Sequence, residues 1–106
     1  MTRYPLYMKA GDDETRVFKY LDFQGVTIVL TGFTASWIGT VGSTTVTVTG
    51  TVDGPNGRVT VVVPHANTTS LQAAGDIGYY KLKVTSGGGA VTTIAGGPLI
   101  MTSPKD

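Results

Sequence analysis

Two stretches of alternating β-branched residues dominate the chain, at residues 44–52 and 58–63. In the first stretch Val46, Val48 and Val52 share one parity, and threonines occupy the other. Because successive side chains of a strand point to opposite faces of a sheet, this period of two predicts two β-strands. The linking residues 53–57, Asp-Gly-Pro-Asn-Gly, supply the backbone conformations of a tight turn. The two stretches are therefore predicted to form a β-hairpin.

The same period recurs elsewhere in the chain. Further strands are predicted at residues 6–8, 16–20, 26–30, 33–38, 79–85, 91–94 and 99–101. The strand at 79–85 places Tyr80, Leu82 and Val84 inward and its alternate residues outward, so that one of its faces is wet. The Gly-Gly-Pro sequence at 96–98 predicts a bend between the last two strands.

One segment departs from the strand pattern. Residues 66–75 contain helix formers, a candidate cap at Asn67 and a terminal glycine, and they predict one or two turns of helix at a sheet crossover. On the strand at 33–38, Trp37 shares its parity with Phe33 and Ala35, which places the only tryptophan in the core.

Short strands separated by regular turns define the expected fold class. The chain is predicted to be all-β, an antiparallel immunoglobulin-like β-sandwich of about 7–8 strands with one short helical crossover. A small barrel is the alternative. Residues 1–13 are expected to form an N-terminal arm or edge strand, residues 14–102 the sandwich, and residues 103–106 a polar tail.

Composition narrows the range of functions. Charged residues make up 14% of the 106 residues, against roughly 25% in an average soluble protein, and such a low surface charge favours assembly with other proteins. The net charge is +1 and the basic residues are scattered, so nucleic acid is not an expected partner. Cysteine is absent. No apolar run has the length of a signal peptide or a membrane span, so the product is expected in the cytoplasm with no membrane partner.

The residues that usually carry chemistry do not converge on a site. Asp12, Asp13 and Glu14 offer oxygen ligands to a hard cation, but no further ligands follow at the required spacing, which favours a solvated turn. His65 is the only histidine and has no nucleophile motif to serve. The chain is therefore expected not to be an enzyme, and to have no metal, cofactor or small-molecule substrate.

Two groups of apolar residues suggest contacts with other molecules. Tyr4, Leu6, Tyr7 and Met8 form an apolar arm that either adds to the sheet of a neighbouring subunit or completes the sheet of its own chain. Tyr79 is expected to be exposed beside two lysines. These five residues are the candidate assembly interface. As an alternative function, the aromatic residues Trp37, Tyr79, Tyr20 and Tyr4 are the elements of a carbohydrate-binding platform.

Four short motifs resemble one family when they are taken in order. They are Val-Leu-Thr-Gly-Phe-Thr-Ala-Ser-Trp-Ile at residues 29–38, Val-Asp-Gly-Pro-Asn-Gly-Arg-Val at 52–59, Leu-Gln-Ala-Ala-Gly-Asp-Ile-Gly-Tyr-Tyr at 71–80 and Gly-Pro-Leu-Ile at 97–100. Together they resemble the N-terminal domain of the tailed-phage baseplate upper protein family, over roughly residues 14–102.

This resemblance implies an immunoglobulin-like structural domain without catalysis. The chain is then expected to be a subunit of a tailed-phage virion, in the tail or baseplate or as an adaptor for fibres. Its expected partners are other tail, baseplate or fibre proteins, and it is expected to form a homo-oligomer made in the host cytoplasm. Position in the particle, copy number and symmetry are left open.

Overall fold

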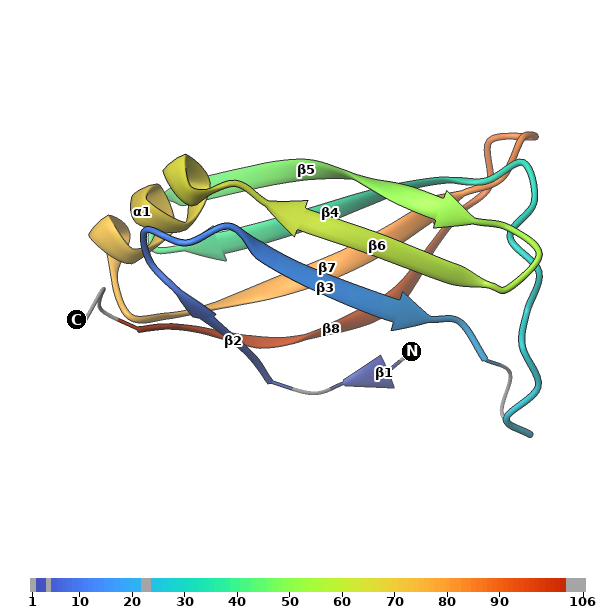
Figure 1. The fold of residues 1–106 in the computed structure, drawn as a ribbon, viewed down its shortest axis with the longest axis horizontal. Coiled ribbons are helices and arrows are strands. Elements are labelled where there is room, and N and C mark those ends of the chain that lie inside the picture. Colours follow the sequence, from blue (N-terminus) through green and yellow to red (C-terminus); the bar gives the residue numbers. More distant parts are fainter. Residues whose placement is uncertain (1, 4, 22–23, 103–106) are drawn as a thin grey trace.

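Eight strands and one helix make up the fold of the described residues (Figure 1). The computed structural model describes residues 2–3, 5–21 and 24–102. The elements are β1 (Thr2–Arg3), β2 (Leu6–Lys9), β3 (Glu14–Lys19), β4 (Thr34–Val41), β5 (Thr44–Asp53), β6 (Arg58–Val63), α1 (His65–Ala74), β7 (Ile77–Thr85) and β8 (Val91–Thr102).

All eight strands belong to one mixed sheet. Its order is β1-β8-β7-β4-β5-β6-β3, with β2 also paired to β8. The prediction of an all-β fold is confirmed, but the wholly antiparallel arrangement is wrong, because β1 and β2 run parallel to β8. An immunoglobulin-like sandwich is not confirmed either. The sheet instead curls on itself into a flattened, nearly closed barrel, which is closer to the alternative prediction.

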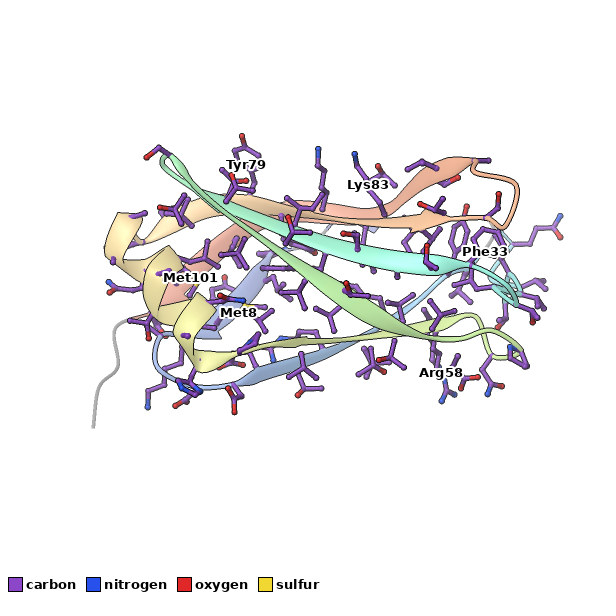
Figure 2. The ribbon with its side chains drawn as sticks, turned by 90° about the horizontal axis from the view of Figure 1, so that it is seen from above. Met8, Phe33, Arg58, Tyr79, Lys83 and Met101 are labelled. Carbon is purple, nitrogen blue, oxygen red and sulfur yellow. The ribbon has the colours of Figure 1, made fainter. Side chains whose placement is uncertain are left out.

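Strand β5 carries the sheet from one layer of this barrel to the other. Its first part pairs with β4 through Thr44 to Gly50, and its last three residues pair with β6. At the crossing point a Cβ atom on Gly50 would lie 2.7 Å from Cγ1 of Val59, so glycine allows the bent strand to approach β6 closely. Figure 2 shows the two layers, with β5 passing obliquely between them. We call β1, β2, β8, β7 and β4 the first layer, and β6 and β3 the second.

The core fills the space between the two layers. Trp37 and Tyr80 are buried and stack with their ring centroids 6.3 Å apart. The predicted inward positions on β7 are confirmed, since Tyr80, Leu82 and Val84 are all buried. The placement of Trp37 in the core is also confirmed. Burial of such aromatic and branched side chains, worth about 1.5–3 kcal/mol each, is the main stabilising term.

Helix α1 covers one end of the barrel, as Figure 1 shows. The predicted helical crossover is confirmed, and Leu71 and Thr68 are its buried residues. Asn67, however, is not the cap. The N-cap position belongs to Pro64, whose side chain has no hydrogen-bonding group, and Asn67 lies within the first turn.

Two predicted elements differ in the structure. Residues 26–30 are not a strand: the amide of Ile28 donates to the Tyr20 carbonyl and that of Leu30 to the Gly54 carbonyl, so the segment runs as an irregular loop. Only Leu30 reaches the core, whereas Val26 and Val29 are exposed. The expected bend at residues 96–98 is also wrong, because β8 continues through it as a single strand with a bulge opposite Leu82 and Lys83.

The N-terminal segment completes the sheet of its own chain. Leu6 pairs with Leu99 and Met8 with Met101, in parallel register. Both side chains of β2 that point inward are buried, and Figure 2 shows Met8 and Met101 inside the barrel. Of the two arrangements considered for the arm, the structure therefore contains the intramolecular one.

Replacing Met8 by Ala tests this packing. We expect a loss of about 2–5 kcal/mol in the free energy of unfolding, because a buried methionine is removed from a closely packed site. Urea denaturation followed by tryptophan fluorescence measures the change. The neighbouring, outward Tyr7→Ala is the control and should cost no more than about 0.5 kcal/mol. Equal effects of the two substitutions would contradict burial of β2.

Candidate functional site

The five predicted interface residues divide into three groups. Leu6 and Met8 are 4% and 1% exposed, so they serve the core and cannot contact a partner. Tyr7 and Tyr79 project outward and are 58% and 64% exposed. Tyr4 lies outside the described residues. The outward pair indicates where a contact surface of this chain begins.

An apolar strip crosses the outer face of the first layer. In the register of β2, β8 and β7, Tyr7 is paired with Ile100, and Ile100 in turn with Ile77. In the adjacent row Pro98 is paired with Tyr79. Ile77 is 71% exposed, so the strip is open to solvent. We define the apolar strip as these five residues: Tyr7, Ile77, Tyr79, Pro98 and Ile100.

A hollow adjoins the strip. Its volume is about 470 Å³, and Gly96 and Gly97 are among the residues that line it, together with Tyr79, Pro98 and Lys81. Gly96 is paired with Lys81 on the same outer face. Because glycine has no side chain, the surface is lower at Gly96 than at the neighbouring Tyr79–Pro98 pair. The hollow is large enough to receive a side chain of a partner.

Three members of the strip were not among the interface residues predicted from the sequence. Ile77, Pro98 and Ile100 were either outside the predicted strands or assigned no surface role. The alternation of β7 already places Ile77 on the same face as Tyr79, so that part of the signal was present in the sequence. The pairing of β2 with β8, which brings Tyr7 beside Ile100, has no local sequence signal.

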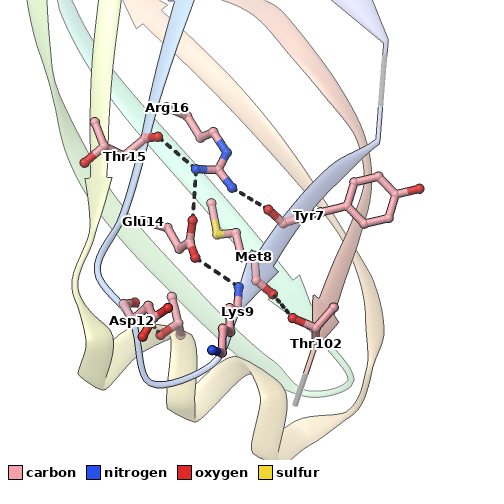
Figure 3. A network of polar contacts seen from close by, with 9 residues as sticks. Tyr7, Met8, Lys9, Asp12, Glu14, Thr15, Arg16 and Thr102 are labelled. Carbon is pink, nitrogen blue, oxygen red and sulfur yellow. Dashed lines mark hydrogen bonds and ion pairs between the residues drawn. The ribbon is translucent and has the colours of Figure 1, made fainter. Parts of the chain in front are cut away.

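Polar side chains join β2 to β3, where the two edges of the barrel meet (Figure 3). Arg16 Nη2 donates to the carbonyl of Tyr7, and its Nη1 lies 2.9 Å from Glu14 Oε1. The other oxygen of Glu14 accepts from the amide of Lys9 at 3.1 Å. Among the described residues no backbone ladder links β2 to β3. The Arg16–Glu14 pair therefore satisfies backbone groups that a fully closed barrel would pair directly.

The turn between β2 and β3 is fastened to the helix. Asp13 Oδ1 accepts from the amide of His65 at 2.7 Å and lies 3.0 Å from the Nδ1 atom of the same residue. Thr68 Oγ1 donates to the Asp12 carbonyl and accepts from the amide of Gly11. Asp13 thus caps the first turn of α1 from a distant part of the chain, the role that Pro64 cannot fill. These hydrogen bonds with His65, the backbone one above all, lower the pKa of Asp13.

These contacts also show what the acidic turn does. Asp13 is directed to His65 and Glu14 to Arg16, so two of the three carboxylates predicted to form a solvated turn have different partners. Within residues 2–3, 5–21 and 24–102, no three His, Cys, Asp or Glu side chains are grouped to hold a metal ion.

The carbohydrate-binding alternative required an exposed aromatic platform. Trp37 is fully buried against Tyr80, and Tyr20 packs against the core. Tyr79 is exposed, but the partner that the platform needed lies on the opposite, inner face of the sheet. The structure therefore removes the tryptophan from any sugar-stacking surface.

No helix in the described part of the chain combines the length and the apolar character needed to cross a bilayer.

Comparisons with known proteins find a similarity of fold. No family model matches the sequence, and no curated protein matches it. Among solved structures, the fold is similar to the N-terminal domain of ORF48 of phage TP901-1, with a TM-score of 0.64. The similarity covers 95% of this chain and 98% of that one, at 11% sequence identity. At this identity the likeness shows a shared fold and no more.

Replacing Arg16 by Met tests the junction between β2 and β3. We expect a loss of about 1–3 kcal/mol in stability, because the Tyr7 carbonyl and the Glu14 carboxylate each lose a partner in a half-buried site. Amide hydrogen exchange measured by NMR should also show faster exchange for Lys9. The exposed Lys19→Met on the same strand is the control and should leave both quantities unchanged. Unaltered protection of Lys9 in the Arg16 variant would contradict the closure described here.

Asp13→Asn tests the distant helix cap through its pH dependence. The pKa of Asp13 is lower in the folded chain, so its charge stabilises the fold above the unfolded value of about 3.9. This stabilisation is lost as the pH falls through the folded value. We expect the variant to melt below the wild type at pH 6, and the gap in Tm to narrow as the pH is lowered below about 3.9. Asp12→Asn, which removes a carboxylate with no side-chain hydrogen bond, should show no gap at either pH.

Proposed function

We propose that this chain is a structural component of a tailed-phage virion, placed in the tail or baseplate or attaching fibres to it. It acts through protein–protein contacts and without catalysis. Its partners are other phage tail, baseplate or fibre proteins. That the chain forms a homo-oligomer remains our prediction, and its copy number is left open.

The fold is the observation that carries the proposal. Nearly the whole chain superposes on nearly the whole of a domain from a phage protein. The four sequence motifs that resemble the baseplate upper protein family come from the same region of the chain, residues 29–100. One line of support rests on local sequence and the other on the path of the backbone. Fold alone does not define function, so the placement in the virion requires a direct test.

The exposed apolar strip supports an assembly role. Monomeric proteins seldom leave several large apolar side chains adjacent on one open face, and such patches mark contacts with other molecules. Here Tyr7, Ile77 and Tyr79 are each more than half exposed. The outer face of β5, in contrast, carries threonines at the corresponding positions. The apolar strip therefore does not continue onto β5.

Purified particles test the proposal. Virions produced from the phage or prophage genome that carries this gene are separated into heads and tails, and the chain is located with a specific antibody. We expect the chain in the tail fraction, with gold-labelled antibody at the distal end of the tail in electron micrographs. A nonsense codon in the gene should yield particles with incomplete tails. Detection of the chain only in the soluble lysate or the head fraction would refute the proposal.

A further inference from the structure

The charged residues on the strands that carry the apolar strip are all positive. β2, β7 and β8 contain the three lysines Lys9, Lys81 and Lys83, and they contain no aspartate or glutamate. The ion pairs of the described residues involve none of these lysines. Figure 2 shows Tyr79 and Lys83 projecting from the same side of the first layer. A partner that covers the strip must therefore meet exposed positive charge beside apolar side chains.

This charge argues against a second copy of the chain as the occupant. If the strips of two copies packed face to face, the lysines of both copies would lie in one interface. These strands offer no carboxylate to balance them. The nearest acidic residue in sequence, Asp76, precedes β7 and accepts a hydrogen bond from Gln72 at 3.2 Å. Juxtaposed like charges disfavour association, and complementary charges favour it.

We propose that the apolar strip and the adjoining hollow form a docking site for another protein, whose contact segment carries apolar side chains flanked by carboxylates. The apolar side chains pack on Ile77 and Tyr79, and one of them enters the hollow beside Gly96. The carboxylates pair with Lys81 and Lys83. This inference deepens the proposed structural role and rests on it, because a virion component requires a surface of this kind.

The register of the sheet sets the geometry of the docking site. Lys81 and Lys83 follow Tyr79 along β7 at alternate positions, so their Cα atoms lie about 7 Å and 13 Å from that of Tyr79. A partner segment thus needs the carboxylates that pair with Lys81 and Lys83 on one side of its apolar residues. The second layer also exposes two apolar residues, Val17 and Val62. They are diagonal neighbours on β3 and β6, where Val17 is paired with Thr60 and Val62 with Thr15, and they provide a control surface.

Selection from a library of random dodecapeptides tests the proposal. The library, displayed on yeast, is selected for binding to the full chain, and the enriched peptides are synthesised with a fluorescent label. We expect the enriched peptides to combine aromatic or aliphatic residues with Asp or Glu. Their affinity, measured by fluorescence anisotropy, should fall at least about tenfold for the double variant Ile77→Ser, Tyr79→Ser. The control variant Val17→Ser, Val62→Ser should bind within about twofold of the wild type.

Charge reversal provides a second readout that does not depend on apolar packing. For the variant Lys81→Glu, Lys83→Glu, the same peptides should bind at least about tenfold more weakly, and a fresh selection should enrich Lys and Arg in place of Asp and Glu. Circular dichroism and the urea midpoint establish that each variant is folded.

Four results would overturn the proposal. The first two are that the library yields no enriched peptides, and that the enriched peptides carry no excess of Asp and Glu. The third is that the peptides bind the variant Ile77→Ser, Tyr79→Ser as tightly as the wild type. The fourth is that size exclusion with light scattering shows a dimer for the wild type and a monomer for this variant. None of these measurements involves virions. A failure of the docking site is thus distinguishable from a failure of the proposed function, which the tail fraction tests.

Discussion

A sheet with one dry face must cover that face, and a chain of this size has only its own strands to do so. Each strand alternates between apolar and polar residues, so a single open sheet would leave its apolar face exposed to solvent. The solution is to fold the sheet on itself. β5 changes layer at Gly50, α1 covers one open end, and the outer edges β2 and β3 come together. All other features of the molecule follow from this requirement.

The meeting of the two edges is the part of the fold that apolar packing cannot complete. β2 and β3 approach without forming a ladder, which would leave backbone groups unpaired in a half-buried position. Arg16 and Glu14 supply the missing partners for Tyr7 and Lys9. A few polar side chains thus close the barrel, and the acidic turn that precedes β3 acquires a structural purpose through Asp13 and His65.

The sequence allowed the inner and outer faces of β4 to β7 to be predicted, because alternation is a local property. The helix was also predictable from its composition and its terminal glycine. The pairing of β2 with β8 was not, since it depends on which edges remain free after the other strands have paired. The same limit applies to the candidate site: Tyr79 could be placed outside, whereas its proximity to Ile100 and Tyr7 follows from long-range register. Residues 26–30 do not form the predicted strand, because the amides of Ile28 and Leu30 donate to the carbonyls of Tyr20 and Gly54 instead of forming a ladder with a neighbouring strand.

The parallel pairing of the first strands with the last one has a mechanical consequence. When tension acts between residues 2 and 102, β2 and β8 are pulled in opposite directions along their own axes. Hydrogen bonds between strands in this geometry are loaded together in shear, so they must rupture as a group. Strands peeled apart from one end, as in a hairpin, would lose their bonds one at a time under a smaller force. The fold is thus arranged to transmit load from one end of the chain to the other before it unravels.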